Sequence, residues 1–135
     1  KIKNEENINT NIVIYDNLYD VISECNKTDE FFDIIITEVI EHMEITEVTV
    51  FLQKIIDNIK FNKIIITTPN YTFNKNYIMD TKFRHADHKY EMNKDEFLEM
   101  ISHLNLNEGT NKTFINVGDI VDNQPCSLGF IISKS

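Results

Sequence analysis

The sequence predicts an α/β fold, a layered sheet in which strands alternate with helices, and three observations support it. Two runs of three isoleucines, at 34–36 and 64–66, are typical of strands buried on both faces of a parallel sheet. A segment with helical apolar spacing separates the two runs. The tail holds two more apolar runs joined by the turn-like VDNQP at 121–125, which predicts a terminal β-hairpin.

The expected strands are short and rich in β-branched residues. In the first half they are residues 11–16 (NIVIYD), 32–37 (FDIIIT) and 62–70 (NKIIITTPN). The hairpin strands are residues 112–120 (KTFINVGDI) and 127–133 (SLGFIIS). The connection between the first two strands, residues 18–32, carries only a weak helical pattern.

Two helices are expected between these strands. Residues 47–60 have apolar side chains at three- and four-residue intervals. These are Val48, Phe51, Leu52, Ile55, Ile56 and Ile59. Residues 93–104 predict the second helix, with Asn93 as its N-cap and acidic residues in its first turn. No repeat or linker interrupts the pattern, so residues 1–135 are predicted to form a single domain.

Composition restricts the class of protein. Hydrophobic residues make up 41% of the 135 residues, which is typical of a globular domain rather than a disordered chain. The two cysteines, Cys25 and Cys126, lie far apart and predict reduced thiols in a cytoplasmic protein. No apolar run approaches the roughly 18 residues of a membrane span, so we expect no membrane partner.

The charge distribution bears on nucleic-acid binding. A net charge of −9 disfavours binding along a long nucleic acid, because that surface is usually basic. Positive residues concentrate between 75 and 94, where the single arginine of the chain, Arg84, also lies. This cluster is either an ordinary mixed surface or a local anion site.

The glycines argue against a complete nucleotide or cofactor loop within this sequence. All three, Gly109, Gly118 and Gly129, fall near the end of the chain. A glycine-rich turn near the start would be needed to let the backbone approach a bound cofactor. We therefore expect no self-sufficient dinucleotide-type cofactor site.

Two glutamates and a histidine follow the second expected strand. If a helix begins at once, Glu38, Glu41 and His42 project from one face at the carboxyl edge of the sheet. Two carboxylates and an imidazole suit a hard or borderline divalent ion. The alternative is the solvated acidic start of a helix, and the local sequence leaves both interpretations open.

Later motifs give the cluster a context. The chain contains Glu38-x-x-Glu41-His42, then TTPN at 67–70, then RHADHKYE at 84–91. Together, in this order and spacing, they resemble the RNA 3′-terminal ribose 2′-O-methyltransferases. This family modifies small RNAs in gene silencing and marks repaired RNA ends in bacteria.

The resemblance implies a partial class I (Rossmann-like) methyltransferase sheet that uses S-adenosylmethionine and a divalent metal, Mg or Mn. It implies a metal held by Glu38, Glu41, His42 and His88. The ion would grip the terminal ribose, lowering the pKa of its 2′-hydroxyl and fixing it in line with the methyl group. The expected reaction is metal-dependent methyl transfer to the 2′-hydroxyl of an RNA 3′ end.

Further roles follow from the same resemblance. Asn17, Leu18 and Thr37 match positions that flank the cofactor. Asn70 and Arg84 are expected to bind RNA. His85 is the candidate to remove the hydroxyl proton, with a surface or supporting role as the alternative.

The sequence departs from the family pattern at its front, where the family carries two further strands and a glycine-rich loop. The chain is therefore expected to be the C-terminal portion of a methyltransferase domain, inactive alone. A missing N-terminal half or a partner chain would supply the cofactor loop. The strand at 32–37 would then be an open apolar edge, which either the strand at 11–16 or a second chain in a homodimer could cover. A metallohydrolase using the same Glu/His cluster and a non-catalytic interaction domain are the alternatives.

Overall fold

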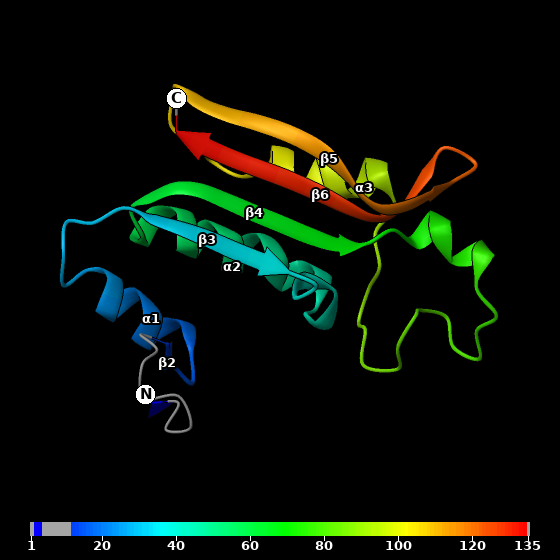
Figure 1. Ribbon diagram of the computed structural model, residues 1–135, viewed down its shortest axis with the longest axis horizontal. Helices are drawn as coiled ribbons and strands as arrows, with labels where there is room; N and C mark the ends of the chain where they lie inside the picture. Colours follow the sequence, from blue (N-terminus) through cyan, green and yellow to red (C-terminus); the bar gives the residue numbers. More distant parts are fainter. Residues whose placement is uncertain (1, 4–11, 135) are drawn as a thin grey trace.

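The computed structural model describes residues 2–3 and 12–134, and its centre is a four-stranded sheet (Figure 1). The strands are β3 (Phe32–Thr37), β4 (Phe61–Pro69), β5 (Thr110–Val121) and β6 (Gln124–Lys134). Their order in the sheet is β3-β4-β6-β5. The β3–β4 pair is parallel, and β6 is antiparallel to both of its neighbours. The predicted α/β sheet with a terminal hairpin is confirmed.

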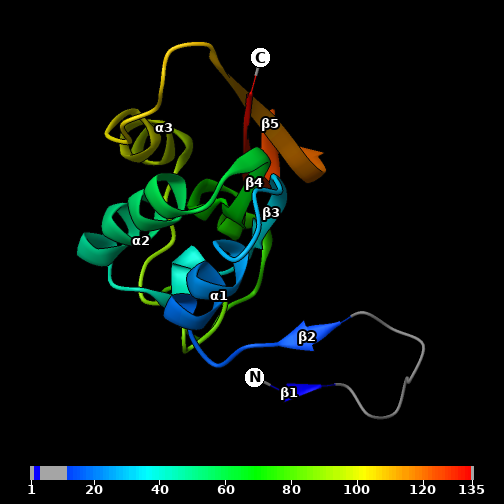
Figure 2. The same cartoon turned by 90° about the vertical axis from the view of Figure 1, so that its left-hand side faces the viewer.

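Three helices lie on one side of this sheet, as Figure 2 shows. They are α1 (Leu18–Cys25), α2 (Ile45–Asn58) and α3 (Lys94–Ser102). Ile64 and Ile66 of β4 pack in one apolar core with Val48 and Leu52 of α2 and Phe97 of α3. All five side chains are at most 1% exposed. Ile64 and Ile66 of the second isoleucine run therefore join the sheet to the helices, because their burial removes apolar surface from water.

The boundaries of α3 follow from its N-cap. The side chain of Asn93 accepts a hydrogen bond from the backbone N–H of Glu96, and the Glu96 side chain accepts one from the Asn93 N–H. This reciprocal capping box satisfies two backbone donors that the helix leaves unpaired. The predicted N-cap is confirmed.

The hairpin depends on positive φ angles and on one close approach. Asp122 and Asn123 form its tip with φ angles of 51° and 62°, a conformation that Asx residues tolerate better than most others. A Cβ atom at Gly129 would lie 2.5 Å from Cγ1 of Ile115 on the neighbouring strand. Glycine at this position lets β5 and β6 pack closely.

The strand predicted at 11–16 is shorter than expected and does not join the four-stranded sheet. Only Val13–Ile14 form a strand, β2, which pairs antiparallel with β1 (Ile2–Lys3) in a separate sheet. Residue 11 lies outside the described residues. The weak pattern at 18–32 contains a regular helix, α1, in which Leu18, Val21 and Ile22 pack against the core. Apolar pattern alone did not specify the partner of a two-residue strand.

Strand β3 is an edge in the part of the chain that the structure describes, since its only paired strand there is β4. Its Ile35 side chain is 68% exposed, so the prediction of a strand buried on both faces is wrong for β3, where the described helices cover one face only. Within residues 2–3 and 12–134, no helix combines the length and apolar character needed to cross a membrane.

Candidate metal site

The candidate site begins with a turn directly after β3. Glu38 has a φ of 53°, and its backbone N–H donates to the carbonyl of Thr67 at 3.0 Å. The chain then forms a short 3-10 helix, η1 (Ile40–His42), before α2 begins at Ile45. An α-helix does not begin at Glu38, so the condition that would place Glu38, Glu41 and His42 on one helix face is not met. Ile40 is 1% exposed, and this anchor places Glu41 inside the protein and His42 at the surface.

Three of the four predicted metal ligands converge. One ligand atom each from Glu41, His42 and His88 lies within 4.8 Å of the other two. The Nε2 atom of His42 is 3.5 Å from Oε2 of Glu41, and the two imidazole rings meet edge to face at 4.7 Å. The cluster opens into a cavity of about 430 Å³, also lined by Glu38 and His85.

The surroundings of the Glu41 carboxylate indicate what the cluster can bind. Its Oε1 atom accepts a hydrogen bond from Thr68 Oγ1 at 3.1 Å, whereas its buried Oε2 has no hydrogen-bond partner among the residues that the structure describes. Burial raises the pKa of Glu41, because the charged carboxylate loses hydration. A buried acceptor without a donor is costly, and a cation coordinated by this oxygen and the two imidazoles would offset that cost. The residues present thus fit a divalent ion.

Both histidines have a carboxylate on the other side of the ring. The Nδ1 atom of His88 is 2.7 Å from Oε2 of Glu91, and the Nδ1 atom of His42 is 3.2 Å from Oδ2 of Asp87. Such partners orient metal-binding imidazoles and leave Nε2 free. The sequence shows Asp87 and Glu91 only as parts of a motif, because their roles depend on how residues 84–91 fold.

The loop that carries these carboxylates is fastened to η1. The backbone N–H groups of Lys89 and Tyr90 both point at the carbonyl of Glu41, at 2.7 and 3.4 Å. His88 itself is 9% exposed. One loop therefore supplies His88 and the carboxylate partners of both histidines.

Glu38 lies at the same cavity but outside the cluster of three. Its carboxylate accepts hydrogen bonds from Thr67 Oγ1 at 2.9 Å and from Ser127 Oγ at 3.3 Å. Its role as the fourth ligand remains a prediction.

The other predicted site residues have diverse positions. His85 lines the cavity and packs edge to face against His88, with ring centroids 4.9 Å apart. Asn17 caps α1 through its side chain, which accepts from the Asp20 N–H at 2.9 Å, and Leu18 packs against the core. Thr37 ends β3, paired with Thr67. None of the three predicted cofactor residues lines the metal cavity.

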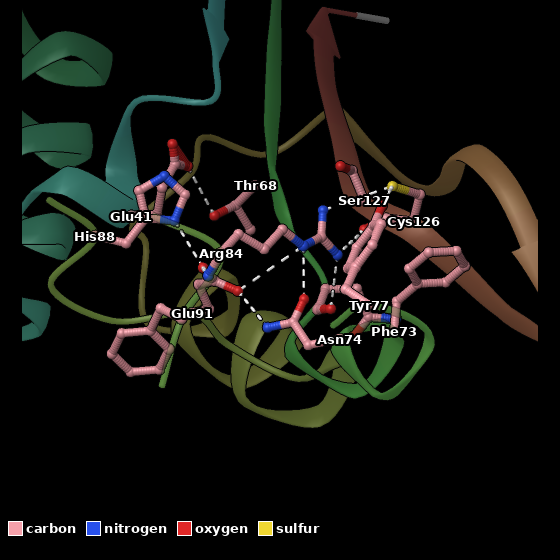
Figure 3. Close-up of polar contacts among 12 residues, drawn as sticks. Glu41, Thr68, Phe73, Asn74, Tyr77, Arg84, His88, Glu91, Cys126 and Ser127 are labelled. Carbon is pink, nitrogen blue, oxygen red and sulfur yellow. Dashed lines mark hydrogen bonds and ion pairs between the residues drawn. The ribbon is translucent and has the colours of Figure 1, made fainter. Parts of the chain in front are cut away.

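Asn70 and Arg84, which were expected to bind RNA, are held from within the protein (Figure 3). Asn70 is 0% exposed, and its amide donates to Gln124 Oε1 and to the carbonyl of Pro125. The Arg84 side chain is 12% exposed and lies over the ring of Tyr77 at 5.2 Å. Its guanidinium donates four hydrogen bonds to protein acceptors, and the side chain also lines the cavity beside the metal cluster.

Comparison with known proteins gives this site a family context. No protein-family model matches the sequence. A small RNA 2′-O-methyltransferase of Caenorhabditis elegans is 32% identical over 74 residues, which are 54% of this chain and 17% of that protein. The crystal structure of small RNA methyltransferase HEN1 matches 78% of this chain and 14% of its own, with a TM-score of 0.67 and 29% identity. A chain in the Pnkp1/Rnl/Hen1 RNA repair complex matches 76% of this chain and 22% of its own, with a TM-score of 0.65 and 29% identity.

The resemblance to the small RNA 2′-O-methyltransferases is confirmed. The fold is that of part of a class I methyltransferase domain. The match covers only 17% of the length of the C. elegans small RNA 2′-O-methyltransferase. It therefore corresponds to one part of these longer proteins.

Proposed function

We propose that this chain is the metal-binding and RNA-end-binding part of an S-adenosylmethionine-dependent RNA 2′-O-methyltransferase. The observation that carries the proposal is the buried, unpartnered Oε2 of Glu41, which shares a cluster with His42 and His88. This cluster occurs in a chain similar to small RNA 2′-O-methyltransferases in sequence and in structure.

Glu41, His42 and His88 would hold the ion, and Glu38 is the fourth ligand that the resemblance implies. The mixture of carboxylate and imidazole donors suits Mg or Mn, with the imidazoles favouring Mn. A divalent ion supplies the chemistry by lowering the pKa of a ribose hydroxyl and fixing its orientation. The adjoining cavity of about 430 Å³ leaves room for the terminal ribose.

His85 is the proposed proton acceptor for the 2′-hydroxyl. It lines the cavity beside His88, and a neutral imidazole nitrogen can accept a proton there. The role of Asn17, Leu18 and Thr37 beside S-adenosylmethionine remains part of the proposal. Because no glycine precedes Gly109, the glycine-rich cofactor loop would come from residues outside this sequence or from a partner chain.

The RNA 3′ end is the proposed substrate, in keeping with the RNA repair complex that contains a similar chain. The net charge of −9 favours capture of one terminus over binding along a strand.

Both described cysteines are free thiols, which fits the cytoplasm as the proposed location.

A binding experiment tests the proposal on this chain. A short RNA ending in a ribose with free 2′- and 3′-hydroxyls is titrated against the chain with Mn²⁺, and again with excess EDTA. We expect metal-dependent binding, which should weaken when the last ribose is 2′-deoxyribose and when His88 is replaced by alanine. Equal affinity for both RNA ends in the presence of Mn²⁺ would contradict the proposal.

A further inference from the structure

A chain of hydrogen bonds runs from Arg84 to His88 through two other buried side chains (Figure 3). It begins at the guanidinium, whose Nη2 donates to the carbonyls of Asn70 at 3.0 Å and Cys126 at 2.6 Å. An arginine side chain can only donate, and it stays protonated in proteins. The direction of every bond that Arg84 makes is therefore fixed.

The orientation of Asn74 follows from Arg84. The Nε of Arg84 donates to Oδ1 of Asn74 at 2.6 Å, and Nδ2 of Asn74 donates to Oε1 of Glu91 at 2.7 Å. Rotating the amide by half a turn would place its NH₂ group against the Arg84 N–H. Such a donor–donor contact in the interior is costly, so the amide keeps one orientation.

Glu91 is the acceptor that joins Asn74 and Arg84 to His88. Its Oε1 accepts from Asn74, and its Oε2 accepts from the backbone N–H of Arg84 at 2.6 Å. The same Oε2 is 2.7 Å from Nδ1 of His88, and the Glu91 side chain is 0% exposed. An ionised carboxylate cannot donate, so the bond to His88 requires a proton on Nδ1. In the neutral ring this leaves the lone pair on Nε2, on the side of Glu41 in Figure 3.

We propose that Glu91, Asn74 and Arg84 are positioning residues that set the His88 tautomer, with the proton on Nδ1 and the Nε2 lone pair turned toward Glu41 and His42. Arg84 thus has a role within the protein, and its expected contact with RNA remains a prediction. Its Nε also lies 4.0 Å from Oε1 of Glu91, which places a positive charge beside that buried side chain. The inference rests on the proposed function only in treating Nε2 as a metal ligand.

The tautomer can be measured without any metal. The chain is labelled with ¹⁵N-histidine, and long-range ¹H–¹⁵N correlation spectra are recorded in EDTA at about pH 8.5, well above the ordinary histidine pKa of about 6.5. The His88 signals are assigned by comparison with His88→Gln. We expect the Nδ1–H tautomer for His88, and the Nε2–H tautomer in the wild-type chain would overturn the inference. This readout does not require any variant of Glu91 to fold.

Glu91→Leu tests the network. A glutamine carbonyl could still accept from the Arg84 N–H and from His88, whereas leucine removes both acceptor oxygens at a similar volume. The His88 tautomer should then become mixed or change to Nε2–H. Mn²⁺ affinity, measured by calorimetry, should fall about 10- to 100-fold, the usual effect of losing such a partner. Asp87→Asn is the matched control, because it faces His42 and should leave the His88 tautomer unchanged.

The His88 tautomer tests the positioning network, and Mn²⁺ affinity tests the proposed metal site. An Nδ1–H tautomer in a wild-type chain that does not bind Mn²⁺ would support the positioning network and count against the proposed metal site. A Glu91→Leu chain that folds and keeps the pure Nδ1–H tautomer would overturn the network. Arg84→Lys is the second variant, because lysine keeps the charge and loses the planar donor fork. A pure Nδ1–H tautomer in folded Arg84→Lys would remove Arg84 from the proposal.

Discussion

Replacing Glu41 by glutamine should stabilise the metal-free protein while abolishing its proposed metal site. The Glu41 side chain is 0% exposed, and its Oε2 is the buried atom without a hydrogen-bond partner. Glutamine removes the buried charge and keeps an acceptor for Thr68 in the place of Oε1. The new NH₂ group would lie near Nε2 of His42, which is 3.5 Å from the oxygen that it replaces.

The expected gain in unfolding free energy follows from Oε2 of Glu41 alone. Leaving a buried acceptor unsatisfied costs about 1–3 kcal/mol, and more where the group is charged. We expect Glu41→Gln to recover about 1–3 kcal/mol of unfolding free energy in EDTA at neutral pH. At about 4 °C per kcal/mol, Tm should rise by roughly 4–12 °C.

The gain should depend on pH in a defined direction. Burial raises the pKa of Glu41 in the folded state above its ordinary value of 4.5, so the folded chain keeps this proton to higher pH than the unfolded chain does. Wild-type stability therefore falls as pH rises from 4.5 through the folded pKa. The advantage of Glu41→Gln should be present above this interval and disappear below it, as thermal unfolding at several pH values would show.

A neighbouring carboxylate provides the control. Glu38 already accepts bonds from Thr67 and Ser127, so Glu38→Gln should be neutral or destabilising under the same conditions. Added Mn²⁺ should stabilise the wild-type chain and leave Glu41→Gln unchanged. The reasoning is refuted if Glu41→Gln is no more stable than the wild-type chain in EDTA at neutral pH.

Three further predictions concern the fold. Asn93→Ala removes one half of the capping box on α3 and should cost about 1 kcal/mol in urea unfolding, and an unchanged midpoint would contradict that role. Gly129→Ala should cost about 1–3 kcal/mol because its Cβ would meet Ile115, and adding Ile115→Ala should recover part of the loss if that contact is the cause. The unpaired edge of β3, with Ile35 exposed, should make the chain associate at micromolar concentration, and Ile35→Lys should shift it toward monomer in sedimentation. A monomeric wild-type chain with slow amide exchange along residues 34–36 would contradict the last expectation.

The centre of the fold could be predicted because its signals are local and repeated. The apolar spacing of α2 marks its inner face, and Ile36, Ile64 and Ile66 of β3 and β4 are buried against the same core. The cap of α3 is equally local, since it joins residues only three positions apart. The partner of β2 depends on contacts between distant segments, and a two-residue ladder offers no pattern from which to predict it.

The candidate site was predictable as a set of residues and not as a geometry. Helical spacing placed Glu38 with Glu41 and His42, whereas the positive φ of Glu38 breaks the helix at its first residue. Side-chain spacing along a sequence carries no information about such a turn, which is held by the contact between the Glu38 N–H and Thr67. The role of Glu91 was hidden for the same reason, because its partner Asn74 lies 17 positions earlier in the chain.

The interior polar groups show where this protein tolerates an unfavourable arrangement. Buried or nearly buried polar side chains near the site are satisfied by protein partners: Thr67, Thr68, Asn70, Asn74, His88, Glu91 and Ser127. Among the described residues, the buried side-chain oxygen without a partner is Oε2 of Glu41. A sequence selected only for stability would replace this carboxylate, because glutamine fits the same space without a charge. Retaining it beside two imidazoles whose outer nitrogens face carboxylates is what a site for a divalent cation requires.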